Sequence, residues 1–128
     1  MIDHIGVPVT NLAEATAFYL KALAPLGIGM IMQVSAEQTG KAGAVGFGAQ
    51  GKPFFWIGDG EKPGDHLHVA FAASSRADVD AFYEAAIAAG AKDNGAPGLR
   101  PIYHADYYGA FVLDPDGNNI EAVCHAPV

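Results

Sequence analysis

The sequence is short of cysteine, of positive charge and of long apolar runs. Its single cysteine, Cys124, excludes an internal disulfide. Seven basic residues stand against 14 acidic ones, which gives a net charge of −7. Because nucleic acids and anionic membrane surfaces are bound through lysine and arginine, we expect neither as a partner. No apolar stretch is long enough to span a bilayer and no signal peptide is visible, so we expect a soluble, cytoplasmic protein.

What the chain does contain is a large apolar fraction. Hydrophobic residues make up 51% of the sequence and charged residues 16%. The length of 128 residues fits one compact domain with a core of its own, so we treat residues 1–128 as a single domain. Since so few charges are available to cover the surface, we expect part of it to be an oligomer interface.

The two halves of the chain resemble each other when the sequence is shifted by 64 positions. The matching segments are 4–7 with 68–71, 17–19 with 81–83 and, with the offset grown to 66, 51–57 with 117–123. An internal repeat of this length predicts two modules, approximately 1–60 and 64–126. The residues between them, rich in glycine and charge, have the composition of a linker.

Each module has the same predicted order of elements, which is a strand, a helix and three further strands. In the first strand, apolar residues alternate with His4 and Gly6, and this period of two is typical of a half-buried strand. Apolar stripes at helical spacing predict the two helices, at 12–23 and 79–87. The strands are predicted at 2–9, 29–34, 44–47 and 54–57, and at 67–72, near 92–96, 107–113 and 119–124. The predicted fold class is therefore α+β, with two tandem βαβββ modules.

Three polar residues are predicted to share one face of the folded sheets. His4 and His68 open the matching strands of the two modules, and Glu121 lies among apolar residues in the last strand. A carboxylate in such a place is costly unless it is paired or bound to a metal. Two imidazoles and one carboxylate suit a divalent transition metal ion and leave coordination positions open to a substrate. The alternatives are a surface histidine at His4 and an exposed edge-strand carboxylate at Glu121. We interpret His66 either as a residue that supports the metal ligands or as a surface residue.

A group of aromatic and basic residues precedes the next-to-last strand. Its members are Arg100, Tyr103, His104, Tyr107 and Tyr108. His104 is a candidate general acid or base. A regular hairpin across the turn at 114–117 places Ala110 opposite Glu121 and Tyr108 on the same face, so Tyr108 is a candidate hydrogen-bond donor to a metal-bound oxygen. The alternative is a loop closed by aromatic packing, with an arginine at an interface.

Residues 4–7 (HIGV), 68–71 (HVAF) and 114–121 (DPDGNNIE) together resemble the vicinal oxygen chelate superfamily, which includes glyoxalase I and the fosfomycin- and bleomycin-resistance proteins. The resemblance covers essentially the whole chain, and the last segment is its most specific part. It implies a cupped mixed sheet with the helices on its outer face, and a homodimer whose sites often use both chains. It also implies His4, His68 and Glu121 as ligands of a divalent ion, with Zn, Ni, Fe and Mn equally suitable.

One departure from that family concerns the reaction. Glyoxalase I has a fourth ligand, a glutamate, in the last strand of the first module, and the repeat places Phe55 there, with Trp56 packing under a helix. A phenyl ring cannot bind a metal, which argues against the glyoxalase I reaction itself. The resemblance then implies a lyase or isomerase that acts on a small substrate chelating the metal through vicinal oxygens. The alternatives are a metal-free protein that sequesters a small molecule, as in bleomycin resistance, and an extradiol-type dioxygenase.

Overall fold

The computed structural model describes residues 1–40 and 42–128 as two βαβββ modules joined by a linker. The first module contains β1 (Ile5–Pro8), α1 (Leu12–Leu23), η1 (Ala24–Leu26), β2 (Gly29–Val34), α2 (Ala36–Thr39), β3 (Ala44–Ala49) and β4 (Lys52–Gly58). The second module contains β5 (His68–Ala72), α3 (Arg76–Ala88), β6 (Lys92–Leu99), β7 (Tyr108–Leu113) and β8 (Asn119–Cys124). The predicted order of elements is confirmed in both modules, and the short helices η1 and α2 are additions to it.

The two long helices begin and end at residues whose chemistry suits those places. Asn11 caps α1 by accepting a hydrogen bond from the backbone of Glu14, and Ser75 caps α3 in the same way. Gly27 ends the helical segment of the first module with a φ of 76°, which glycine adopts without a steric penalty. Among the described residues, no helix is both long and apolar enough to cross a membrane.

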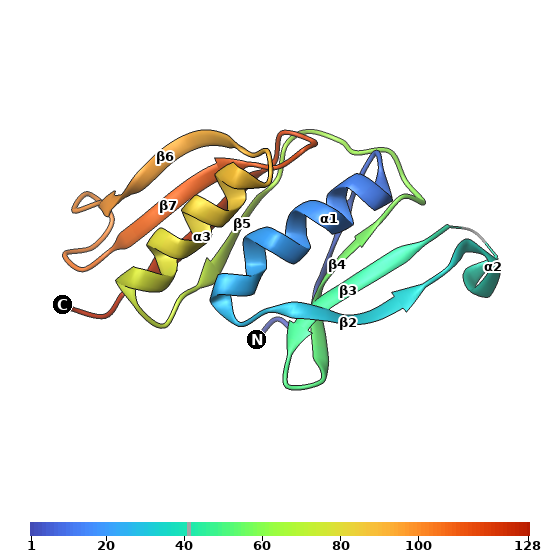
Figure 1. Cartoon of the computed structure of the whole chain (residues 1–128), viewed down its shortest axis with the longest axis horizontal. Helices are drawn as coiled ribbons and strands as arrows, with labels where there is room; N and C mark the ends of the chain where they lie inside the picture. The colour runs from blue at the N-terminus through green and yellow to red at the C-terminus, as the bar shows by residue number, and fades with distance from the viewer. Residues whose placement is uncertain (41) are drawn as a thin grey trace.

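The strands form two separate mixed sheets, which confirms the α+β class. The first sheet has the order β1-β4-β3-β2 and the second has the order β5-β8-β7-β6. In each sheet the first strand runs parallel to the last, and the other pairs are antiparallel. Figure 1 shows α1 over the first sheet and α3 over the second, on the same side of the molecule. Each sheet therefore has one face covered by a helix and one face, which we call its open face, turned away from it.

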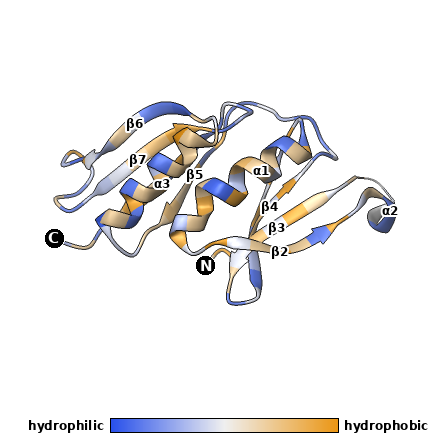
Figure 2. Cartoon of the chain, in the orientation of Figure 1, coloured by the Kyte–Doolittle hydropathy of each residue, from blue (hydrophilic) through white to orange (hydrophobic). Residues whose placement is uncertain are grey.

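The core lies between the helices and the covered faces, and it continues from one module to the other. The rings of Phe55 in β4 and Phe71 in β5 are 5.2 Å apart, edge to face. The hydroxyl of Tyr19 in α1 donates a hydrogen bond of 2.5 Å to the buried carboxylate of Asp114, which precedes the final hairpin strand. Figure 2 shows that β3 and β4 are mostly hydrophobic, whereas the helices carry hydrophilic residues on their outer side. The two modules thus share one core.

The register of the sheets corrects one prediction about the first module. Trp56 pairs with Gly6 in β1 just as Glu121 pairs with Ala70 in β5, so Trp56 is the counterpart of Glu121. Phe55 is fully buried on the covered face. The predicted match of Glu121 with Phe55 is wrong by one residue, and Trp56 lies on the open face rather than under a helix. The cause is that the offset between the modules grows by one residue, not by two.

The last hairpin is also one residue out of the predicted register. Glu121 lies opposite Phe111, not Ala110, and Tyr108 lies opposite Cys124 on the covered face. The reason is that the loop between β7 and β8 includes Asn118 in addition to the four-residue turn. The buried Asn118 amide donates to the carboxylate of Asp114 and accepts from the backbone of Leu67. The local bond to Asp114 and the long-range bond to Leu67 together hold Asn118 out of the ladder.

Candidate functional site

The open face of the second sheet brings together two of the predicted metal ligands. Nε2 of His68 and Oε1 of Glu121 are 2.8 Å apart. This contact follows from the pairing of β5 with β8, because Ala70 lies opposite Glu121 and His68 stands two residues earlier on the same face. The side chain of Glu121 is 1% exposed, whereas that of His68 is 54% exposed. A buried carboxylate therefore lies directly beneath an accessible imidazole.

Tyr107 holds the other oxygen of the same carboxylate. Its hydroxyl donates a hydrogen bond to Oε2 of Glu121 from the loop that leads into β7. Burial and this bond to Glu121 raise the pKa of Tyr107 to about 12, so the hydroxyl keeps its proton at neutral pH. Gly109 leaves the room for the pair, since a Cβ there would come 3.1 Å from the ring of Tyr107 and 3.3 Å from Oε2. Both oxygens of Glu121 thus have a partner.

The sequence predicts Tyr108 for the site, and the structure places its neighbour Tyr107 beside Glu121. Tyr108 lies on the covered face, where its hydroxyl donates 2.6 Å to Asp80 of α3 and the guanidinium of Arg76 lies 5.2 Å above its ring. The bond to Asp80, followed by burial, raises the pKa of Tyr108. The structure therefore joins Tyr108 to α3 and not to Glu121, and its role in catalysis stays a prediction. A hairpin register shifted by one residue would have identified Tyr107.

His104 reaches the site through a row of aromatic rings. Its ring centroid lies 5.8 Å from that of His125, and the ring of His125 lies 5.1 Å from that of Tyr107. Nδ1 of His104 accepts a hydrogen bond from the backbone of Asp106, so its neutral form carries the ring proton on Nε2. His104 is exposed and, within the part of the chain that the structure describes, forms no hydrogen bond or ion pair with His68 or Glu121. Its predicted role as an acid or base stays untested.

His4 is not assembled with the other two ligands within one chain. It is exposed, and its Nδ1 lies 2.7 Å from Asp3, whose carboxylate also lies 2.7 Å from Nζ of Lys52. Lys52 and then His4 lower the pKa of Asp3. In residues 1–40 and 42–128, no three histidine, cysteine or acidic side chains converge on a point that would hold a metal ion. A single copy thus supplies His68 and Glu121 together and His4 apart from them.

The donor atoms on the second sheet nevertheless suit a divalent metal. An imidazole nitrogen and a carboxylate oxygen, already adjacent, are a typical pair of ligands for Zn, Ni, Fe or Mn. Tyr107 orients the carboxylate from behind, as outer-shell partners of metal ligands do. His66 is not part of this group, because it lies against the turn at Gly117. The residues of one chain therefore fit two positions of a metal centre.

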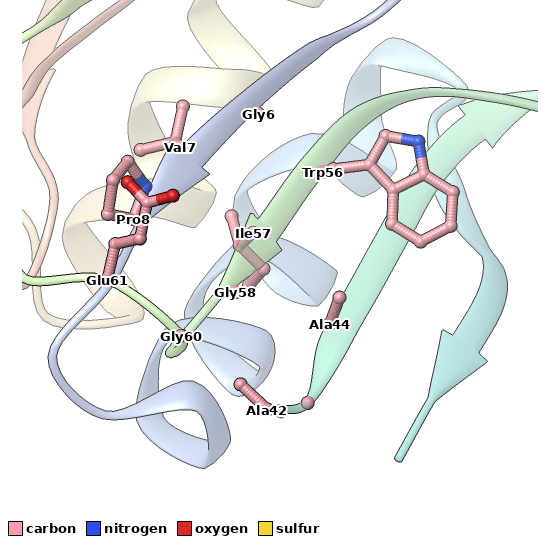
Figure 3. Close-up of a pocket in the computed structure, with 11 residues that line it drawn as sticks. Gly6, Val7, Pro8, Ala42, Ala44, Trp56, Ile57, Gly58, Gly60 and Glu61 are labelled. Atoms are coloured by element: carbon pink, nitrogen blue, oxygen red, sulfur yellow. The ribbon is translucent and has the colours of Figure 1, made fainter. Parts of the chain in front are cut away.

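The open face of the first sheet has a different character. It holds a pocket of about 450 Å³, shown in Figure 3, in which the indole of Trp56 projects beside small residues. The other lining residues from the strands and the linker include Gly6, Pro8, Ala44, Gly58 and Glu61. An indole stands here where the second sheet has its carboxylate, so the pocket on this face is lined mainly by apolar groups.

Comparison with known proteins identifies the family of this chain. The family model described as Glyoxalase/Bleomycin resistance protein/Dioxygenase superfamily matches residues 1–122. A glyoxalase/bleomycin resistance protein from Albidiferax ferrireducens T118 is 31% identical, with 99% of each chain covered and a TM-score of 0.78. No curated protein matches the sequence.

Two further structures share the fold at lower identity. Glyoxalase I from Zea mays is 20% identical, with a TM-score of 0.73 over 96% of this chain and 45% of that one. A point mutant of the fosfomycin resistance protein FosX from Listeria monocytogenes, in complex with Mn(II) and 1S,2S-dihydroxypropylphosphonic acid, is 19% identical, with a TM-score of 0.71 over 100% of this chain and 94% of that one. The chain belongs to the Glyoxalase/Bleomycin resistance protein/Dioxygenase superfamily.

Proposed function

We propose that this protein is a metal-dependent enzyme of glyoxalase-like type, a lyase or isomerase whose small substrate chelates the metal through vicinal oxygens. The observation that carries the proposal is the buried carboxylate of Glu121 held between His68 and Tyr107. Burial of a charged side chain in a strand is typical of a functional group, because desolvation costs several kcal/mol (about 2–7 even for neutral polar groups). Here the carboxylate faces an accessible imidazole, which is the arrangement that a metal ion needs.

We further propose that a second copy of the chain completes the metal centre. His68 and Glu121 come from one copy, and His4 comes from the open face of the first sheet of the other copy. A twofold dimer of this kind contains two identical centres. Two apolar side chains beside the ligands support an interface there, since Ile2 is 78% exposed and Leu67 is 41% exposed. The low charge of the surface supports it as well.

Each residue then has a separate task. A bound divalent ion would supply Lewis-acid polarisation of the substrate oxygens. Tyr107 keeps Glu121 in one orientation and holds its own proton on the hydroxyl oxygen at neutral pH. The ring of Phe111, opposite Glu121 in the ladder, covers the open face beside His68 and reduces contact with water. Because Trp56 stands in place of a fourth ligand, the expected substrate chemistry differs from that of glyoxalase I.

The test is the metal content of variants purified without added ions. His68→Ala and His4→Ala should each lose most of the bound metal, whereas His66→Ala, two residues from a ligand but against the turn at Gly117, should keep it. Mixing the His4→Ala and His68→Ala proteins under conditions of subunit exchange sharpens the result. Shared centres predict recovery of about one quarter of the wild-type metal content, because half of the dimers are mixed and each has one intact centre. Unchanged metal in His68→Ala would reject the proposal.

The pocket on the first sheet favours a second candidate, a metal-free protein that binds and sequesters a small molecule. Its apolar lining and the ring of Trp56 suit an aromatic compound. Since Trp56 is the single tryptophan, its fluorescence reports binding there directly. This candidate predicts negligible metal in the purified protein together with quenching of Trp56 by small aromatic compounds. Oxygen uptake with a catechol and Fe(II) would instead indicate the dioxygenase alternative.

A further inference from the structure

A single arginine lies across the open face of the second sheet, next to the candidate metal ligands. The guanidinium of Arg100, which follows β6, lies 5.4 Å above the ring of Phe111. The other neighbour of that ring is His68, whose imidazole centroid is 6.3 Å away. Phe111 pairs with Glu121 in the ladder and therefore shares its face. A guanidinium, a phenyl ring and a metal-ligating imidazole thus follow one another along one surface.

Two glycines of β6 let the guanidinium lie close against the sheet. A Cβ on Gly95 would come 3.2 Å from one terminal nitrogen of Arg100, and a Cβ on Gly98 would come 3.1 Å from the other. Gly95 pairs with Phe111 and Gly98 with Gly109, so both glycines belong to the open face. Side chains at these two positions would push Arg100 away from the surface. The two glycines of β6 therefore leave room for a cationic side chain to lie flat against the sheet.

The charge of Arg100 is not neutralised within the protein. Across the described part of the chain, its guanidinium has no carboxylate within ion-pair distance, although acidic residues outnumber basic ones two to one. The guanidinium donates a hydrogen bond of 2.8 Å to the backbone carbonyl of Ala96. By contrast, the guanidinium of Arg76 lies 3.9 Å from the carboxylate of Asp106. Arg100 is half-buried beside an aromatic ring, where a charge that has no counter-ion is costly.

We propose that Arg100 binds an oxyanion group of the substrate, a carboxylate or a phosphate, while the other end of the same molecule reaches the metal centre at His68. The planar fork of a guanidinium matches both groups through paired hydrogen bonds. A molecule that spans the two sites crosses the face of one ring, Phe111. The substrate class is therefore a small anion with two neighbouring oxygens at its far end. The identity of that far end rests on the proposed function, whereas the anion site does not.

The test uses metal-free protein and inorganic probes, so that it does not depend on activity. In ¹⁵N–¹H spectra of protein treated with a chelator, sodium phosphate and sodium acetate are titrated separately against sodium chloride of equal ionic strength. We expect saturable shifts of the Arg100 Nε–H and of the amides of Gly95 and Gly98. The anion that binds more tightly indicates whether the natural group is a phosphate or a carboxylate.

Three substitutions distinguish a specific anion site at Arg100 from a general attraction of anions to positive charge. Arg100→Gln should weaken binding of the preferred anion by about tenfold or more, as expected for loss of a charged hydrogen-bond donor. Lys92→Gln removes the same charge from the other end of β6 and should change the affinity by less than about twofold, since exposed charges at a distance are screened. Arg100→Lys keeps the charge without the fork and should give an intermediate loss. Equal affinities for the wild type and Arg100→Gln, or equal losses for Arg100→Gln and Lys92→Gln, would overturn the proposal.

A parallel metal titration keeps this proposal distinct from the proposed function. Arg100→Gln should bind metal as the wild type does, and His68→Ala should lose metal while the phosphate or acetate shifts remain. Anion binding at Arg100 in a protein that binds no metal would reject the proposed function and leave the anion site standing. Metal binding without any anion effect at Arg100 would reject the anion site alone.

Discussion

The two modules have the same topology and different open faces. Both begin with a histidine at the same position, His4 and His68, and both close the first strand against the last. In the second module the last strand brings Glu121 to the histidine, and the loop before β7 adds Tyr107. In the first module the matching place is taken by Trp56, beside an apolar pocket.

The difference shows that an internal repeat keeps residues at equivalent positions of the fold without keeping the chemical character of their side chains. A histidine at the start of a strand is accompanied by a buried carboxylate in one module and by an exposed aspartate, Asp3, in the other. One open face therefore supplies the charged groups and the other supplies an apolar wall. The proposed metal centre takes His68 and Glu121 from one open face and His4 from the other. Because the three do not converge within the described residues of one chain, we expect two copies of the chain to contribute to it.

The largest expected effect concerns two neighbouring residues of β4 that the register places on opposite faces. Phe55→Ala should destabilise the protein by about 3–5 kcal/mol, because the ring is fully buried among other aromatic rings. Trp56→Ala should cost about 1–2 kcal/mol, because the indole is only half-buried at the pocket. Urea denaturation followed by circular dichroism measures both. A larger loss for Trp56→Ala would mean that the sheet faces are assigned the wrong way round.

The second prediction compares two neighbouring tyrosines of the second module. Tyr107→Phe should weaken metal binding by about 10–100-fold, because Glu121 loses the hydroxyl that orients it. Tyr108→Phe should leave the metal affinity unchanged and lower stability by about 0.5–1.5 kcal/mol through the lost bond to Asp80. Competition with a chromogenic chelator measures the affinity, and denaturation measures the stability. A loss of metal affinity in Tyr108→Phe alone would support the role predicted for Tyr108 and contradict the one assigned to Tyr107.

The order of elements could be predicted from the sequence because its signals are local. The period-two alternation around Ile5 and the helical stripe that includes Tyr19 each depend on a few neighbouring residues. The strand register could not be predicted in this way, since a slip of one residue moves every side chain to the other face. Here the slip is set by Asn118, whose buried amide is held by Asp114 and by the backbone of Leu67. The bond to Asp114 is local, but the bond to Leu67 joins segments 51 residues apart and leaves no local pattern in the sequence.

The candidate site also has parts that the sequence predicts and parts that it does not. The contact between His68 and Glu121 follows from the alternation of two paired strands, so the sequence already places both on one face. The position of Tyr107 beside Glu121 depends on the hairpin register, and the position of Arg100 depends on Gly95 and Gly98 of β6. The distance of His4 from the other ligands within one chain depends on how the two sheets are arranged. These parts require the tertiary structure because each depends on contacts between different strands and loops, which the pattern within one element does not show.

The smallest expected effect is a pH dependence that again compares the two modules. Burial and then the charge of Asp114 raise the pKa of Tyr19 well above its ordinary value of 10.0. The folded protein therefore keeps this proton at a pH where the unfolded chain has lost it. The resulting stability is fully present below about pH 10 and is lost as the pH rises further, by up to about 1.4 kcal/mol per pH unit. We expect Tyr19→Phe to flatten this alkaline decline of the free energy of unfolding.

The repeat offers a matched control for that experiment, because Tyr83 occupies the position of Tyr19 in the second module. Its hydroxyl donates to the exposed Asp93, and its pKa is raised as well, by burial first. Solvent screens this contact, so Tyr83→Phe should change the alkaline decline much less than Tyr19→Phe does. All other groups are the same in every variant, so the difference between variants removes their contribution. Equal declines in both variants would show that the bond between Tyr19 and Asp114, which connects the two modules, makes no measurable contribution to the pH dependence of the free energy of unfolding.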